Sequence, residues 1–167
     1  MFHLTTKKFA IFESPNIMKY WLMKSEPCEV SILDLEQKKR VRWDGVRNYQ
    51  ARNYMRDDMQ VGDLIIFYHS SCDEICPAVV AEVASLPYPD HTQFTKRSKY
   101  LDAKSTKENP RWILVDVRFV KKFPQIVSRA EMQKNVKLKN LMLWNRPRLS
   151  IIPLTEQEFK TIVSLVN

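Results

Sequence analysis

Short strand-like segments outnumber helical ones in this chain and do not alternate with them regularly, which constrains the fold more than any other feature. Residues 64–68 form a continuous apolar run, typical of a strand buried on both faces. Residues 113–119 alternate between apolar and polar side chains, as a half-exposed strand does. The predicted strands are Tyr20–Met23, Leu64–Tyr68, Ala78–Val83, Ile113–Phe119 and Arg148–Ile152. We expect the second and third of these to pair as a hairpin.

Three pairs of residues with capping-box spacing predict the starts of short helices. These pairs are Ser31 with Asp34, Ser128 with Glu131, and Thr155 with Glu158. Another helix is predicted from about Tyr49 to Asp57. Strands in this number exceed what a parallel βαβ scheme uses, and 167 residues suit one domain. The sequence therefore predicts an α+β fold, with a mixed, mostly antiparallel curved sheet or β-barrel and short helices packed outside.

The run from Trp43 to Asn53 (Trp-Asp-Gly-Val-Arg-Asn-Tyr-Gln-Ala-Arg-Asn) has the composition of a binding site. Flat rings stack on bases, while carboxamides and guanidiniums contact polar base edges and phosphates. A plainer interpretation is a glycine turn leading into an amphipathic helix, with Trp43 as a core anchor. That interpretation accounts for Gly45 but leaves Asn48, Arg52 and Asn53 without a role, so we favour a site.

The same run, together with four further segments in order, resembles the EVE domain family. The four segments are Tyr20–Pro27, Gly62–Ser70, Ala81–Asp90 and Arg148–Thr155. The resemblance implies a PUA-like β-barrel related to the YTH domain, and it covers the chain from Met18 to the C-terminus. We therefore expect an EVE domain at 18–167 and a poorly structured extension at 1–17. One departure is Pro77-Ala78, which stand where the family tends to have glycines.

Polar residues at two strand ends are further candidates for the site, because strand ends commonly line binding mouths. Lys24 and Ser25 end the first strand, and Tyr68 and Ser70 end the central one. The plainer alternative in each case is a strand that runs into a turn. Two other tryptophans are expected to stabilise the fold and not to contact a ligand. Trp21, inside an apolar strand, and Trp112, at a strand start, are expected to pack in the core.

Positive charge is concentrated in one part of the chain. The net charge is +8, yet residues 91–150 alone hold 15 Lys and Arg against 4 Asp and Glu. Such an asymmetry favours a face that binds a polyanion, although a solvated basic surface would give the same count. Arg52, Arg146 and Arg148 are the expected phosphate contacts, because guanidinium forks match phosphate geometry. The lysines of residues 96–107 are expected on a mobile loop beside the pocket.

Several other classes of site lack their sequence signatures. We find no glycine-rich phosphate loop, no paired aspartates for two metals and no dinucleotide fingerprint. His69, Cys72 and Cys76 lack a nearby fourth ligand, so we expect no metal and no cofactor, and His69 has no catalytic partner pattern. Three cysteines indicate a reducing compartment, cytoplasmic or, in a eukaryote, nuclear. No apolar run is long enough to span a membrane.

Together these features predict a module that binds nucleic acid carrying a modified base, a modified cytosine or adenine, rather than an enzyme. By the resemblance, Trp43 belongs to an aromatic cage, while Asn48 and Ser25 read the base edge. Lys24, Asn53, Tyr68 and Ser70 complete the expected base-binding set. One rival is a hydrolase of modified nucleosides, as among ASCH domains, which would use Lys24 and Glu26. A second rival is a protein-interaction barrel. DNA and RNA remain equal alternatives, and no protein partner is predicted.

Overall fold

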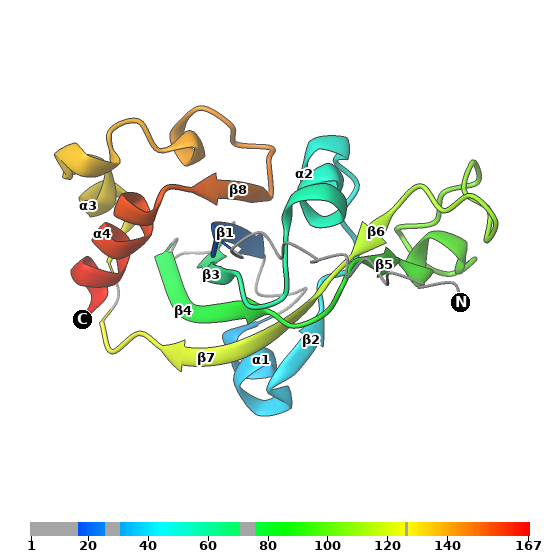
Figure 1. Cartoon of the computed structure of the whole chain (residues 1–167), viewed down its shortest axis with the longest axis horizontal. Helices are drawn as coiled ribbons and strands as arrows, with labels where there is room; N and C mark the ends of the chain where they lie inside the picture. Colours follow the sequence, from blue (N-terminus) through cyan, green and yellow to red (C-terminus); the bar gives the residue numbers. More distant parts are fainter. Residues whose placement is uncertain (1–16, 26–30, 71–75, 126) are drawn as a thin grey trace, which may run out of the picture.

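A six-stranded sheet forms the body of the computed structural model, which describes residues 17–25, 31–70, 76–125 and 127–167. The strand order is β2-β7-β4-β3-β1-β8 (Figure 1). The bounds of its strands are β1 Tyr20–Ser25, β2 Arg40–Arg42, β3 Leu64–His69, β4 Cys76–Val83, β7 Asp116–Lys122 and β8 Ile151–Leu154. A second, two-stranded sheet joins β5 (Tyr88–Pro89) to β6 (Ile113–Leu114). The predicted α+β class is confirmed.

The large sheet is mixed and mostly antiparallel, as predicted. Only β1 and β3 run parallel, and β3 pairs with β4 as the expected hairpin. The expected closure into a barrel is wrong for the described residues, because β2 and β8 stand at opposite edges of the sheet. Both edge strands are short, and Pro153 in β8 has no N–H to donate to a further strand. The sheet curves strongly without closing (Figure 1).

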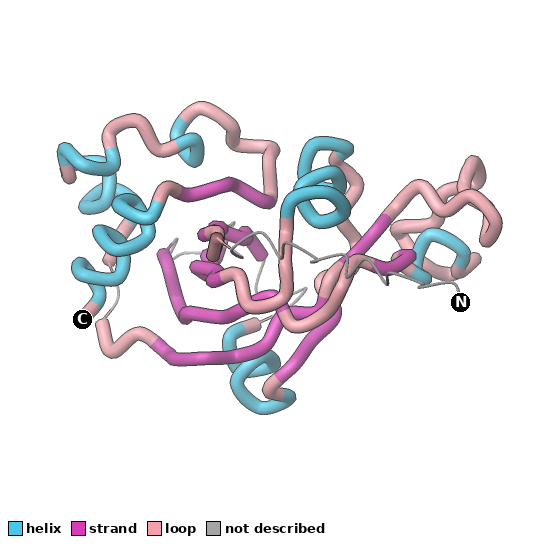
Figure 2. Tube along the Cα trace, viewed as in Figure 1, coloured by secondary structure: helices cyan, strands magenta, loops and turns pink. Residues whose placement is uncertain are grey.

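The α-helices of the described residues are short and lie around this sheet (Figure 2). They are α1 Ile32–Lys38, α2 Tyr49–Asn53, α3 Arg129–Lys134 and α4 Glu156–Val166. The three predicted capping boxes, at Ser31, Ser128 and Thr155, are all present. Helix α1 contacts β2 and β7, while α4 contacts β1 and β8. Among the described residues, none of the helices combines the length and apolarity needed to cross a membrane.

Several element boundaries differ from those expected, and backbone hydrogen bonds explain two of the differences. The strand expected over 113–119 divides at Val115, whose carbonyl accepts the backbone N–H of Trp43 rather than pairing within a ladder. The last strand begins at Ile151 rather than Arg148, because the N–H of Leu149 closes a turn onto the carbonyl of Arg146. The helix from Tyr49 ends in a π-helical turn at Tyr54–Asp58. The extension expected at 1–17 lies, except for Ile17, outside the described residues.

A buried aspartate ties the first strand to the turn before β3. The Asp63 carboxylate accepts hydrogen bonds from Trp21 Nε1 and from the backbone N–H groups of Lys19 and Gln60, each at 3.0 Å. Trp21 lies in the core, as predicted. Asp63 is buried as well, so its charge is compensated by these three donors. The Gly62-Asp63 motif therefore serves the fold rather than the site.

Replacing Asp63 by Asn should lower the free energy of unfolding by about 2 kcal/mol or more, because buried donors lose a charged acceptor. Urea unfolding would measure the change. Asp57→Asn is the matched control, since Asp57 is exposed and bonds only its neighbour Arg56, and it should change stability by less than about 0.5 kcal/mol. Equal stability of the two variants would contradict the structural role of Asp63.

Candidate nucleic-acid-binding site

A pocket of ≈ 670 Å³ opens where four segments meet: the end of β1, the segment between β2 and α2, the loop after β5 and the loop before β8. Its volume lies within the range of about 300–1,000 Å³ that is usual for ligand pockets. The lining residues are Lys24, Ser25, Trp43, Asp44, Gly45, Val46, Arg47, Asn48, Lys99, Tyr100, Arg148 and Ser150.

The structure brings half of the predicted site residues into this lining and leaves the rest outside. Lys24, Ser25, Trp43, Asn48 and Arg148 line the pocket, although they come from three separate segments. The predicted residues outside the lining are Arg52, Asn53, Tyr68, Ser70 and Arg146. The pocket thus brings together two of the predicted motifs, the one at the end of the first strand and the run that begins at Trp43.

Trp43 is at once a wall of the pocket and part of the core. Its side chain is 5% exposed, and its ring meets Phe67 edge-on at a centroid distance of 5.4 Å. The two interpretations of this residue, core anchor and site residue, are therefore compatible. The ring packs on Phe67 in the core and also lines the pocket. A ring held in this way loses little freedom when a flat ligand packs against it.

Asn48 positions helix α2 as well as lining the pocket. Its Oδ1 accepts a hydrogen bond from the N–H of Ala51 at 3.0 Å, which makes it the N-cap of the helix. This hydrogen bond fixes the orientation of the carboxamide, because Oδ1 must face the N–H of Ala51. The Nδ2 group donates no hydrogen bond to the other described residues and remains the part of Asn48 that can contact a ligand.

Lys24 fastens the loop before β8 to the end of β1. Its Nζ donates to the carbonyl of Pro147 at 2.7 Å, and its backbone N–H donates to the carbonyl of Ser150 at 2.8 Å. Burial, and then the positive charge of Arg129, lower the pKa of Lys24. These contacts hold Arg148, which lies between the two acceptors in sequence, at the rim of the pocket.

Four of the predicted residues outside the lining contribute to the surrounding structure. Tyr68 is 2% exposed within the core, and Ser70 continues the pairing of β3 with β1 by donating its N–H to the carbonyl of Ser25. The guanidinium of Arg52 bonds Asn53 Oδ1 and the carbonyl of Arg111. It also lies over the Tyr49 ring at 4.8 Å. Arg146, the fifth, is exposed at the surface.

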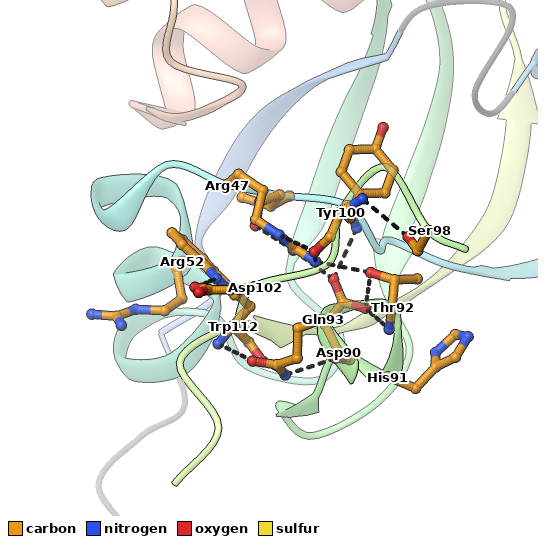
Figure 3. Close-up of polar contacts among 12 residues, drawn as sticks. Arg47, Arg52, Asp90, His91, Thr92, Gln93, Ser98, Tyr100, Asp102 and Trp112 are labelled. Atoms are coloured by element: carbon orange, nitrogen blue, oxygen red, sulfur yellow. Dashed lines mark hydrogen bonds and ion pairs between the residues drawn. The ribbon is translucent and has the colours of Figure 1, made fainter. Parts of the chain in front are cut away.

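The wall of the pocket between β2 and α2 is held by one buried carboxylate (Figure 3). Asp90 is 1% exposed, and its Oδ2 accepts from the backbone N–H of Gly45 at 3.0 Å and from Arg47 Nη1 at 2.9 Å. Its Oδ1 accepts from the backbone N–H and the hydroxyl of Thr92. Burial alone would raise the pKa of Asp90, but the bonds from Thr92, Arg47 and Gly45 outweigh it and lower the pKa.

Gly45 allows Tyr100 to pack against the backbone of the same wall. Its φ of +76° lies in the left-handed region, and a Cβ at this position would come within 2.6 Å of the Tyr100 ring. The guanidinium group of Arg47 lies close to two rings. Its central carbon is 5.3 Å from the centroid of the Tyr100 ring and 5.3 Å from that of the Trp112 ring. Tyr100 thereby becomes a second aromatic residue in the lining.

The basic loop of residues 96–107 is joined at Ser105 to a buried glutamine, while its expected mobility stays a prediction. Gln93 is 0% exposed, and its Oε1 accepts from Ser105 Oγ and from the N–H groups of Arg111 and Trp112. Its Nε2 donates to the carbonyls of Asp90 and Trp112. Trp112 packs against Tyr49 and is buried, as predicted. The loop brings Lys99 and Tyr100 into the pocket lining.

The described part of the lining carries four cationic side chains and one carboxylate. Lys24, Arg47, Lys99 and Arg148 supply the positive charge, and Asp44 the negative charge. Partial burial, and then repulsion from Asp90, raise the pKa of Asp44. An excess of positive charge around a ring-walled cavity suits an aromatic ligand attached to phosphates.

Among the described residues no three His, Cys, Asp or Glu side chains gather closely enough to hold an ion. Cys28 and Cys72 lie outside the described residues, and so do the side chains of Cys76, Pro77 and Ala78. His69 Nε2 is buried and finds no hydrogen-bond partner in the described parts of the chain. Burial lowers the pKa of His69, which favours its neutral form.

Sequence reasoning missed several residues that shape the pocket, above all Arg47, Asp90, Gly45 and Tyr100. Gly45 was visible as one of only two glycines in the chain, and Asp90 lay at the end of a segment shared with the EVE family. The contact between them spans 45 positions in sequence, so neither residue indicated the other. Tyr100 had no local signal.

Comparison with known proteins places this chain among characterised sequences. The model of a family described as the EVE domain matches residues 19–165. Human thymocyte nuclear protein 1 is 41% identical over 169 residues, which cover 90% of this chain and 75% of the human protein. The zebrafish (Danio rerio) protein of the same name is 42% identical, with 88% and 71% covered.

Solved structures agree with these relatives. A hypothetical protein from Leishmania major superposes with a TM-score of 0.85 at 43% identity, covering 89% of this chain and 94% of the other. Human THYN1 protein, solved in complex with DNA containing 5-methylcytosine, superposes with a TM-score of 0.84 at 42% identity. That match covers 89% of this chain and 98% of the human one.

Gly45→Ala should destabilise the protein more than Gly62→Ala, which serves as its matched control. Both glycines have positive φ, +76° and +95°, but a Cβ at Gly62 meets nothing within 4 Å. Gly62→Ala should therefore cost only backbone strain, about 1–2 kcal/mol. Gly45→Ala should cost about 1–3 kcal/mol more because it also displaces Tyr100. Thermal and urea unfolding would measure both, and equal losses would contradict the tight contact.

Asp90→Asn should lower stability by about 3 kcal/mol at neutral pH, because the partly buried Arg47 loses its charged partner. The pKa of Asp90 is lowered in the folded state, so its contribution is complete above the unfolded value of about 3.9 and is lost as pH falls through the folded value. The stability difference between wild type and variant should therefore stay constant from pH 7 to about pH 5 and shrink below about pH 4. Urea unfolding at stepped pH would test this, and a difference that persists unchanged to pH 3 would contradict it.

Proposed function

This chain belongs to the EVE domain family, and we propose that it is a nucleic-acid-binding module that captures a modified base in the pocket between Trp43 and Arg148. One observation supports the proposal most strongly. Two aromatic residues, Trp43 and Tyr100, line the same cavity of ≈ 670 Å³ as a rim of cationic side chains. Bases stack on rings and phosphates pair with cations, so this lining matches both parts of a nucleotide.

The similarity to human THYN1 protein supports the same proposal. That protein was solved with DNA containing 5-methylcytosine, and it shares 42% of its residues with this chain over nearly its whole length. A modified cytosine in DNA is accordingly the first ligand to test. A modified adenine and an RNA strand are the other members of the proposed class. The relatives' name, thymocyte nuclear protein, supports a nuclear location if the source is eukaryotic.

We assign the roles of the lining residues from their contacts. Trp43 and Tyr100 supply the rings, while Ser25 and the Nδ2 group of Asn48 contact the base edge. Arg148 and Lys99, whose residues are exposed at the rim, bind phosphates there. The remaining predicted residues act around the pocket. Arg146 extends the cationic surface, while Arg52, Asn53, Tyr68 and Ser70 support the walls.

The captured base is bound and not converted, in this proposal. Lys24, which a hydrolase of modified nucleosides would use, donates its Nζ to the carbonyl of Pro147 and anchors a loop. Glu26, its possible carboxylate partner, lies outside the described residues. Incubating the protein with modified nucleosides and analysing the products by chromatography distinguishes the two classes. Appearance of a deacylated or deaminated product would overturn the binding-module proposal.

The central test is a set of anisotropy titrations with single-stranded and duplex oligonucleotides, in DNA and RNA form. Each sequence carries 5-methylcytosine, N6-methyladenine or the unmodified base at one position. We expect tighter binding of at least one modified strand than of its unmodified control. Equal affinity for every modified and unmodified pair would contradict base capture. Absence of any oligonucleotide binding would favour the protein-interaction alternative.

Two substitutions of Asn48 should distinguish its contact with the base from its contribution to the stability of helix α2. Asn48→Ala removes the N-cap and should cost about 1 kcal/mol of stability. Asn48→Ser keeps a capping oxygen but removes the amide donor, so its stability should stay close to wild type. Both variants should lose part of the preference for the modified base, by about 1–3 kcal/mol. Paired titrations and melts would show this, and full preference in Asn48→Ser would remove Asn48 from the reading set.

Arg148→Ala should weaken binding of modified and unmodified strands by similar factors, because a phosphate contact carries no base information. The slope of log affinity against log salt should become shallower by about one unit. Arg56→Ala is the control, since Arg56 is exposed and paired with Asp57 outside the pocket lining. An altered preference without a change in slope would assign Arg148 to the base instead.

A further inference from the structure

Among the described residues, Asp44 is the one carboxylate in the lining of a pocket that otherwise carries positive charge. Its side chain is only partly accessible to solvent, and the residue follows Trp43 in the wall between β2 and α2. A carboxylate at this position repels the phosphates that the rim attracts, which weakens the general affinity for nucleic acid. A role in contacting the base would offset that cost.

Charged acceptor groups are scarce among the described side chains of the lining, although the hydroxyls of Ser25, Tyr100 and Ser150 can also accept hydrogen bonds. Arg47 and Lys99 carry donors only, and Lys24 donates to Pro147. The side-chain oxygen of Asn48 is committed to the cap of α2. Asp44, in contrast, forms no hydrogen bond or ion pair with the other described side chains or with their backbone. Its two carboxylate oxygens are therefore acceptors that the fold leaves available to a ligand.

The neighbouring cations attract Asp44 without forming a bond to it. The positive charges of His91, Arg42 and Arg47 lower its pKa, but burial and Asp90 outweigh them. Asp44 also borders a second hollow, lined in part by Arg40, Arg42 and Asp116. Arg40 is already engaged there, because its Nη2 pairs with Asp116 at 2.7 Å. On the other side, Asp90 takes the bond from Arg47. Partial burial and repulsion by Asp90 raise the pKa of Asp44, as expected for a carboxylate that lacks a donor.

We propose that Asp44 accepts a hydrogen bond from the exocyclic amino group of the captured base, so that the pocket selects 5-methylcytosine over thymine. The inference rests on the proposed function and names the base edge that the pocket reads. An ionised carboxylate pairs with the N4 amino group of cytosine, and adenine offers the equivalent N6 group. Thymine presents a carbonyl oxygen at that position, and two acceptors facing each other leave the carboxylate unpaired.

Thymine and 5-methylcytosine form a matched pair of ligands for this test. Both carry the same methyl group at position 5 and have nearly the same shape, so that stacking on Trp43 and Tyr100 contributes equally. They differ at position 4, where one has an amino group and the other an oxygen, and in the protonation of N3. The discrimination expected from one such edge contact is about tenfold to a hundredfold in affinity.

The experiment titrates the full chain with two single-stranded DNA oligonucleotides that differ only by 5-methylcytosine or thymine at one position. Wild type should bind the 5-methylcytosine strand at least about tenfold more tightly. Asp44→Asn should bring the two affinities within about threefold of each other, by weakening the first and strengthening the second, because a carboxamide can also donate to an oxygen. Its melting temperature should stay close to wild type, since the side chain has no hydrogen-bond or ion-pair partner to lose among the described residues.

Asp57→Asn is the control for removal of one negative charge, because Asp57 is exposed and lies outside the pocket lining. This variant should keep the wild-type ratio of the two affinities. An Asp44→Asn variant that keeps the wild-type ratio, or that weakens both strands equally, would overturn the role of Asp44 while the proposed function stands. A wild-type chain that binds neither this strand nor any other modified oligonucleotide overturns the proposed function and this inference with it.

Discussion

The pocket depends on the buried carboxylate of Asp90, which joins two stretches of chain that would otherwise have no reason to meet. One oxygen holds Gly45 and Arg47 of the segment between β2 and α2, and the other holds Thr92 at the start of the basic loop. A charge buried at this depth is tolerated only because each oxygen finds donors, which fixes both segments in one relative position. Trp43 and Tyr100 reach the same cavity as a result.

The same side chains serve the fold and the pocket, and this overlap has a practical consequence. Trp43 packs on Phe67, Asn48 caps α2, and Lys24 anchors the loop that carries Arg148. Removing any of these side chains changes a wall as well as a contact. The two effects separate only in conservative substitutions that keep the structural bond, or in stability measurements made alongside every titration.

In the function that we propose, charge in this site divides between attraction of phosphates and reading of the base. The rim cations act on any phosphate backbone and fade with added salt, so they contribute affinity without choosing a base. Asn48 Nδ2 and the Asp44 carboxylate are short-range groups of opposite hydrogen-bonding character, a donor and an acceptor. A donor and an acceptor side by side specify one pattern of base edge, which a set of cations alone cannot do.

The sequence by itself determined what depends on neighbours along the chain. Apolar runs and capping boxes gave the strands and helices their places, and the motifs at Lys24-Ser25 and Trp43–Asn48 indicated the site. Contacts between distant residues were decided only by the tertiary structure. The Asp90 carboxylate accepts a hydrogen bond from Gly45, 45 positions away in sequence. The side chain of Gln93 accepts one from the backbone N–H of Trp112. The guanidinium of Arg52 bonds Asn53 and Arg111 and does not line the pocket. The sheet stayed open for a similar reason. Closure requires two edge strands to meet, and local sequence pattern specifies which residues form a strand but not which strands pair.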